Sequence, residues 1–133
     1  MLLKNYFEYN ATLFGELVKM VTFNGTEVTM NSPFTYGSKC LVGSGSTPAK
    51  VDDYTLEAEI AGITTTFNVN VSDAGTKVVN IISNLTSNTV NISEVGIAGY
   101  VNNSTGVLLT RTVLEEPIVL EVGDVVVIET QFA

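Results

Sequence analysis

Residues 91–132 read NISEVGIAGYVNNSTGVLLTRTVLEEPIVLEVGDVVVIETQF, and this stretch carries the strongest signal for the fold class. Apolar residues alternate along it, and the alternation is interrupted by a loop at 102–106, by Pro117 and by Gly123-Asp124. Period-two alternation broken by turn residues about every 8–12 positions is typical of an antiparallel β-sandwich or barrel. The stretch contains almost no catalytic chemistry, so it favours a packing or assembly module over an enzyme.

The same pattern continues upstream. We predict strands at residues 38–43, 63–71, 77–85, 90–100, 107–114, 118–122 and 124–132, and we expect the last two to pair with each other. Asn24-Gly25 predicts a hairpin over residues 21–30 with a type I′ turn, which needs φ > 0 at both residues. Residues 44–60 are predicted to form a loop and a short turn that Asp52 or Asp53 caps, with Tyr54, Leu56 and Ile60 pointing inward. The predicted fold class is therefore all-β, an antiparallel sandwich of about seven to nine strands.

The first 30 residues fit two structures. Residues 1–20 partly match helical spacing, whereas their aromatic and β-branched residues favour a strand. One prediction is a short N-terminal arm or helix that serves, together with the hairpin, in attachment to a neighbour. The alternative is an ordinary first helix or strand that packs on the core of its own domain. Polar residues interrupt any signal-peptide pattern. Residues 1–133 are expected to form one domain.

Composition excludes several classes of partner. The net charge is −8, and the six cations never cluster. Phosphate binding needs several cations on one face, so neither nucleic acid nor an anionic membrane surface is an expected partner. There is no apolar run of about 18 residues that would span a membrane. Charged residues make up only 15% of the chain, against a typical share of about 25%, which predicts a homo-oligomer or a docked subunit.

Enzyme chemistry is also poorly represented. The chain contains no His, which removes the commonest general base and a common metal ligand. Cys40 is the only cysteine and lies in an apolar run, so we expect a buried thiol. The Gly-rich stretch at 43–47 lacks the Gly-Lys-Ser/Thr ending of a phosphate-binding loop, and the acids at 52–59 lack EF-hand spacing. We therefore predict no catalytic residue, no cofactor and no metal site.

Four residues are candidates for a structural or interface role: Glu94, Gly96, Arg111 and Asp124. Antiparallel pairing across the loop at 102–106 places residues whose numbers sum to roughly 205–208 opposite each other, so Glu94 falls near Arg111, the only Arg. We predict a cross-strand contact, bidentate in its strongest form. The alternative is an exposed ion pair of little energetic weight. Gly96 predicts a bulge or close backbone crossing, and Asp124 a tight turn with Gly123.

Several short patterns in this order resemble a family of small structural proteins of tailed bacteriophage particles. They are VGSGSTP at 42–48, DDYTLE at 52–57, NLTSNTVNISEVGI at 84–97, LLTRTVL at 108–114 and PIVLEVGDVVVIET at 117–130. The resemblance covers residues 40–132. It implies a non-enzymatic virion protein, assembled in the host cytoplasm, whose partners are the major capsid protein or proteins of the tail and portal.

Within that family we favour a capsid-associated auxiliary or decoration protein, and a tail or head-fibre component is the alternative. A carbohydrate-binding adhesion module is a hypothesis from another class. It would stack sugars on exposed aromatic residues, for which Tyr36, Tyr54 and Tyr100 are the candidates. A small hydrolase that uses carboxylates alone is the remaining enzymatic alternative.

Overall fold

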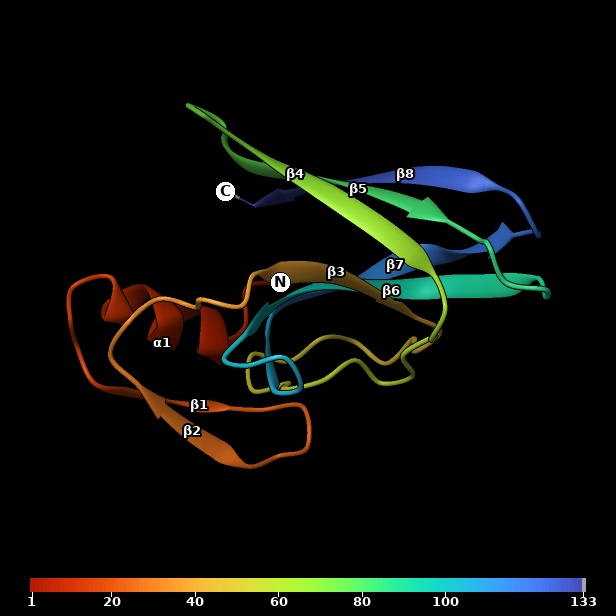
Figure 1. The fold of residues 1–133 in the computed structure, drawn as a ribbon. Helices are drawn as coiled ribbons and strands as arrows, with labels where there is room; N and C mark the ends of the chain where they lie inside the picture. Colours follow the sequence, from red (N-terminus) through yellow and green to blue (C-terminus); the bar gives the residue numbers. More distant parts are fainter. Residues whose placement is uncertain (133) are drawn as a thin grey trace.

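The computed structural model describes residues 1–132, which form eight strands in three antiparallel sheets and one helix (Figure 1). This confirms the predicted all-β class. In chain order the elements are α1 (Lys4–Thr12), β1 (Val18–Val21), β2 (Glu27–Met30), β3 (Ser38–Gly43), β4 (Thr64–Ser72), β5 (Gly75–Ser83), β6 (Val90–Tyr100), β7 (Gly106–Leu120) and β8 (Val125–Phe132).

Two three-stranded sheets stack to form the sandwich. The outer sheet has the order β4-β5-β8, and the middle sheet has the order β3-β6-β7 (Figure 1). Inward-facing apolar side chains of both sheets form the main core, as period-two alternation requires. Its buried members are Cys40, Val42, Ile82, Ile92, Val95, Leu120 and Ile128.

The second face of the middle sheet is covered by the N-terminal part of the chain and by residues 44–63. Leu3 and Leu56 are buried against Ala98 and Leu108. The β1-β2 hairpin and α1 contribute a third cluster around Met20 and Leu109, with Tyr6 packed against it. The middle sheet is therefore covered on one face by the outer sheet and on the other by α1, the β1-β2 hairpin and residues 44–63.

The N-terminal residues pack on their own domain. Leu2 bridges to Thr110, and the Leu3 amide donates to the Leu109 carbonyl at 2.9 Å, so the first residues extend the edge of β7. The buried Asn5 side chain donates to the Val21 and Leu108 carbonyls, which ties α1 to the hairpin and to β7. The segment therefore packs on its own core, and its use in attachment to a neighbour stays a prediction. Among residues 1–132, no helix has the length and apolarity needed to cross a membrane.

Three details of the predicted strands are wrong. Strand β7 runs through Pro117 without ending, and the pairing with β6 absorbs the break as a register shift between Ile92 and Glu94. Strand β8 pairs with β5, not with the end of β7, because the turn at Gly123 carries the chain from one sheet to the other. The hairpin turn is not type I′, because this turn needs positive φ at both Asn24 and Gly25. Gly25 has φ +81°, but among the described residues no residue other than Gly has positive φ.

The edges of the two large sheets differ. Residues 1–3 cover part of the β7 edge, and the segment near Glu59 covers part of the β3 edge, where the Ile60 amide donates to the Val42 carbonyl at 2.9 Å. In the outer sheet, β4 and β8 are the end strands, and no other strand of residues 1–132 pairs with their outer sides.

Candidate functional site

A buried carboxylate organises the face of the middle sheet opposite the main core. The side chain of Glu94, on β6, is fully buried. It accepts backbone hydrogen bonds from Gly45 at 2.8 Å, Glu57 at 2.9 Å and Ala58 at 2.8 Å. One carboxylate therefore fixes two separate points of the loop at 44–63 to the sheet.

Arg111 on β7 supplies the countercharge, and it is only 2% exposed. Its Nε donates to Glu94 Oε1 at 2.9 Å, and its two terminal nitrogens donate to Asp53 Oδ2 and to the Thr47 carbonyl, also at 2.9 Å. Asp53 in turn accepts the Lys50 amide at 2.9 Å. We call Glu94, Arg111 and Asp53 the clamp, because together they hold the loop onto the sheet.

The clamp keeps its charges in spite of burial. Burial by itself would raise the pKa of Glu94, but the Arg111 hydrogen bond and the three backbone N–H groups outweigh it, and the pKa is lowered from its ordinary value of 4.5. Burial would lower the pKa of Arg111, whereas hydrogen bonds to Glu94 and Asp53 outweigh burial and raise the pKa above its ordinary value. Both partners are therefore ionised at neutral pH.

Two glycines make room for the carboxylate. A Cβ atom on Gly43 would lie 2.5 Å from Glu94 Oε2, and a Cβ on Gly45 would collide with the same oxygen and with Glu57. Neither glycine has a positive φ, so space rather than backbone conformation explains them. The Gly-Ser-Gly stretch at 43–45 therefore packs directly against the Glu94 carboxylate, and its two glycines leave the space that this carboxylate occupies.

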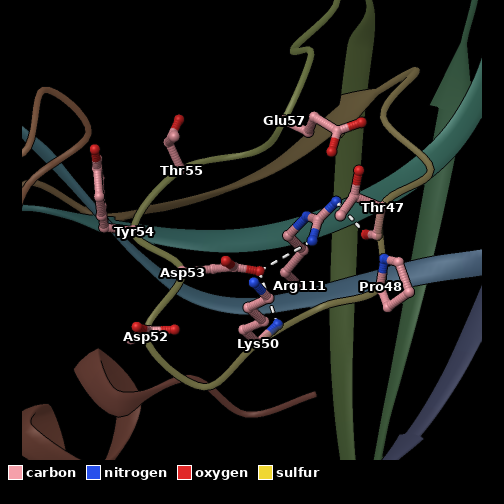
Figure 2. A pocket seen from close by; sticks show the side chains of 9 residues that line it. All are labelled: Thr47, Pro48, Lys50, Asp52, Asp53, Tyr54, Thr55, Glu57 and Arg111. Carbon is pink, nitrogen blue, oxygen red and sulfur yellow. Dashed lines mark hydrogen bonds and ion pairs between the residues drawn. The ribbon is translucent and has the colours of Figure 1, made fainter.

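An open pocket of about 390 Å³ lies over the clamp. Figure 2 shows Arg111 at its centre, with Asp53 on one side and Thr47 on the other. Tyr54 and Asp52 point away from the guanidinium, and Tyr54 is 41% exposed. The prediction that Tyr54 points inward is therefore wrong, whereas that for Leu56 is confirmed.

The predicted site residues have separate outcomes. The Glu94–Arg111 contact is present, but it is buried rather than exposed and it is not bidentate, because the terminal nitrogens of Arg111 bind other acceptors. The residue of β6 that pairs directly with Arg111 is Gly96, so Glu94, two residues before Gly96, is a diagonal cross-strand neighbour of Arg111. A Cβ on Gly96 would lie 2.6 Å from the Thr110 carbonyl, which confirms a close backbone approach.

Asp124 lies in the turn between β7 and β8 and takes no part in the clamp. Its amide donates to the Glu121 carbonyl and its carboxylate accepts the Glu121 amide, both at 3.0 Å, around Gly123 with φ +86°. The predicted tight turn is confirmed. Asn84 binds the same turn from the end of β5 through backbone hydrogen bonds to Gly123 and Asp124.

Sequence reasoning missed Gly43, Gly45 and the pairing of Asp53 with Arg111. The available signal was the alternation of Gly with Ser just after a strand, together with the single Arg of a chain of low charge. Asp53 was expected only as a cap, and it does accept the Lys50 amide, but its second hydrogen bond crosses 58 residues to Arg111.

The arrangement offers little for catalysis. Every nitrogen of the Arg111 side chain already has a protein acceptor. Burial raises the pKa of the Cys40 thiol to about 12, so it is not a nucleophile at neutral pH. Within residues 1–132 no group of three or more His, Cys, Asp or Glu side chains is placed to hold a metal ion. What the clamp can do is fix the loop at 44–63.

No protein-family model, no curated protein and no solved structure matches this chain.

Proposed function

We propose that this chain is a non-enzymatic structural protein of a tailed-bacteriophage particle, and that it is a capsid-associated auxiliary or decoration protein. The ordered sequence patterns at residues 42–130 and the all-β sandwich support this role. The clamp supports this role as well, because the buried charges of Glu94 and Arg111 hold a loop in place and are not available to a substrate.

The observation that carries the proposal is the outer sheet, whose two end strands are nearly uncharged and have no partner strand within residues 1–132 on their outer edges. Strand β4 contains no charged residue, and β8 contains only Glu129, which is paired with Lys77 at 3.4 Å. Proteins that stay monomeric usually protect such edges with charges, prolines or bulges. An unprotected edge is suited to strand addition by a neighbouring chain.

The face of the outer sheet that points away from the core exposes several large apolar side chains. Val125 and Val127 on β8 are 61% and 54% exposed, and Ile81 is paired with Val127 across the sheet. Major capsid protein, or a tail or portal-proximal protein, is the partner that the family resemblance implies. A subunit of the particle would cover these valines on assembly, which explains why a chain with so few charges exposes them.

Immunogold electron microscopy of particles of the phage that encodes the chain tests the proposal. We expect gold over the heads. Label confined to the tails would replace the decoration role with the tail or fibre alternative, and particles without label would contradict the whole class.

An edge variant extends this test to the mechanism. Val127→Lys should leave the fold intact but reduce incorporation of the protein into particles, because it adds a charge beside an open edge. Leu85→Lys is the matched control, since Leu85 is also exposed but lies after the end of β5. Equal incorporation of both variants would argue against docking through β8.

A carbohydrate-binding role is the second candidate, and one observation favours it. Tyr54 borders the pocket over the clamp together with Asp52, Asp53 and Thr55, so an aromatic ring and carboxylates lie at one opening. Tyr36 is also exposed, whereas Tyr100 is half-buried beneath the Lys39 ammonium. A glycan array that gives binding by the wild type and none by Tyr54→Ala would support this role, and an array without binding would remove it.

A further inference from the structure

An apolar groove of about 390 Å³ opens between the two sheets at the end of the sandwich near α1. Val78 and Leu109 form its buried floor, and Val69, Val71 and Phe132 lie along its sides. In Figure 1 the hairpin of β4 and β5 extends beyond the end of the middle sheet, and Val69, Val71 and Thr76 of this hairpin line the groove.

Two apolar side chains at the groove are exposed although the alternation along β4 places them on the face that points towards the core. Thr65 and Phe67 on β4 are half-buried, but Val69 and Val71 on the same face are 51% and 79% exposed. None of the residues that line the groove is charged, and its polar side chains are those of Tyr6, Thr76 and Thr110. A small-molecule site usually has polar groups that orient the ligand, and here such groups are few.

The same chain displays an apolar loop that no contact explains. Leu13, Phe14 and Leu17 follow α1, and Phe14, at 86% exposure, is the most exposed large apolar side chain of the described residues. The loop is ordered by a Schellman motif, in which Gly15 donates to the Thr12 carbonyl at 3.0 Å and Glu16 to the Ala11 carbonyl at 3.2 Å. Phe14 is therefore held out on a fixed turn.

We infer that the groove receives the Phe14 loop of a second copy of this chain. The groove is apolar and uncharged, the loop presents an aromatic ring flanked by leucines, and each is the main unexplained apolar surface at that end of the molecule. The loop follows α1, and Tyr6 of α1 lines the groove, so loop and groove lie at the same end of the molecule and two copies can exchange them reciprocally in a closed two-fold pair. The partner is thus supplied by the chain itself.

Charge fits this pairing. A chain with net charge −8 repels its copies at long range. The groove has no charged lining residue, so Glu16 of the loop meets no like charge there, and added salt should strengthen the pair by screening the remaining charges. Ion pairing between copies would have the opposite salt dependence. Two exchanged aromatic loops bury less than the roughly 1,200–2,000 Å² of a standard interface, so the pair should be weak and concentration-dependent in solution.

Sedimentation velocity on the purified full chain over a concentration series tests the inference. We expect the wild type to shift from monomer towards dimer, more so at higher salt. Phe14→Ser and Val71→Asn should each weaken association at least about tenfold, because a buried aromatic anchor and its pocket dominate such contacts. Leu85→Ser, at a site 72% exposed outside both surfaces, should associate like the wild type.

Mixing the two weakened variants makes the test specific. The Phe14→Ser chain keeps an intact groove and the Val71→Asn chain keeps an intact loop, so the mixture should associate more strongly than either variant alone. Thermal unfolding of each variant by circular dichroism confirms that it is folded. A wild type that stays monomeric at every concentration and salt, or a dimer that neither substitution weakens, would overturn the inference.

A cross-linking variant gives a readout that does not depend on affinity. Phe14→Cys mixed with Val71→Cys should give a covalent dimer with a short bismaleimide, and Leu85→Cys in place of either should not. Cys40 needs no replacement, because it is buried and its thiol pKa is raised to about 12. Absence of the cross-link, or an apolar dye that binds the groove of a strictly monomeric chain, would overturn the second-copy occupant.

The pairing deepens the proposed particle role and its biological relevance rests on that role, but the two can fail separately. Gold label on particles together with a monomeric chain would leave the structural role standing and remove the pairing. A dimer in solution without label on any particle would do the reverse.

Discussion

Two neighbouring residues of β7 separate two unlike regions of this molecule. Thr110 lines the apolar groove between the sheets, whereas Arg111 belongs to the clamp on the opposite face. In the clamp the chain buries its only Arg almost completely, and in the groove it leaves Val71 79% exposed. This inverts the usual distribution of charged and apolar side chains.

The difference shows where intramolecular contacts are complete and where they are not. Glu94 and Arg111 have hydrogen-bond partners on every side, all from the same chain. Val69 and Val71 have the inward orientation of core residues but no opposing layer. We therefore expect substitutions in the clamp to affect folding, and substitutions in the groove to affect association with little effect on folding.

Arg111→Ala should give the largest effect. It leaves the fully buried Glu94 without its countercharge, and breaking a buried pair in this way costs about 3–5 kcal/mol. The free energy of unfolding in urea measures it. Lys77→Ala is the control, because it removes an exposed pair with Glu129 that contributes about 1 kcal/mol or less. Equal destabilisation by the two variants would show that the clamp has no special weight.

Gly45→Ala should come next. The added methyl group meets Glu94 and Glu57 in a packed site, and such overpacking costs typically about 1–3 kcal/mol. Ser44→Ala is the matched control on the adjacent exposed residue. A Gly45→Ala chain that unfolds at the same urea concentration as Ser44→Ala would contradict the role of this glycine as the wall of the carboxylate site.

Acid should weaken the clamp selectively. The folded-state pKa of Glu94 lies below its ordinary value of 4.5, so its stabilising effect is fully present above pH 4.5 and is lost as the pH falls through the lowered folded-state pKa. Thermal midpoints of the wild type and Glu94→Gln, measured from pH 7 downward, should therefore converge below pH 4.5. A constant difference between them at all pH values would show that Glu94 does not titrate as proposed.

Val71→Thr in the groove should have the smallest effect on stability. The side chain is mostly exposed, and surface substitutions of this kind usually change the free energy of unfolding by no more than about 0.5 kcal/mol. Urea unfolding at low protein concentration checks this. A loss as large as that of Gly45→Ala would mean that Val71 is part of the monomer's core and not of an open surface.

The clamp was only half predictable from the sequence. Glu94 and Arg111 flank one hairpin, so register arithmetic over a short loop brings them close. Asp53, Thr47 and the amides of Gly45, Glu57 and Ala58 come from a loop 36 to 64 residues away along the chain, and no local period encodes how that loop returns to the sheet. The bidentate geometry failed for the same reason, since these distant acceptors take the terminal nitrogens of Arg111.

The all-β class, the strands with clear period-two alternation and the tight turn at Gly123 follow from the sequence alone, because these depend on local backbone preferences and on which side of a strand faces water. Tertiary structure decided that β8 joins β5 rather than β7, because both pairings satisfy the same alternation. It decided that residues 4–12 are helical, since the Leu3 N-cap has no side-chain hydrogen bond and the Lys4 amide donates instead to the carbonyl of Val51. It also decided which apolar residues stay exposed, because exposure depends on whether another layer lies opposite, and that is a property of the assembled sheets.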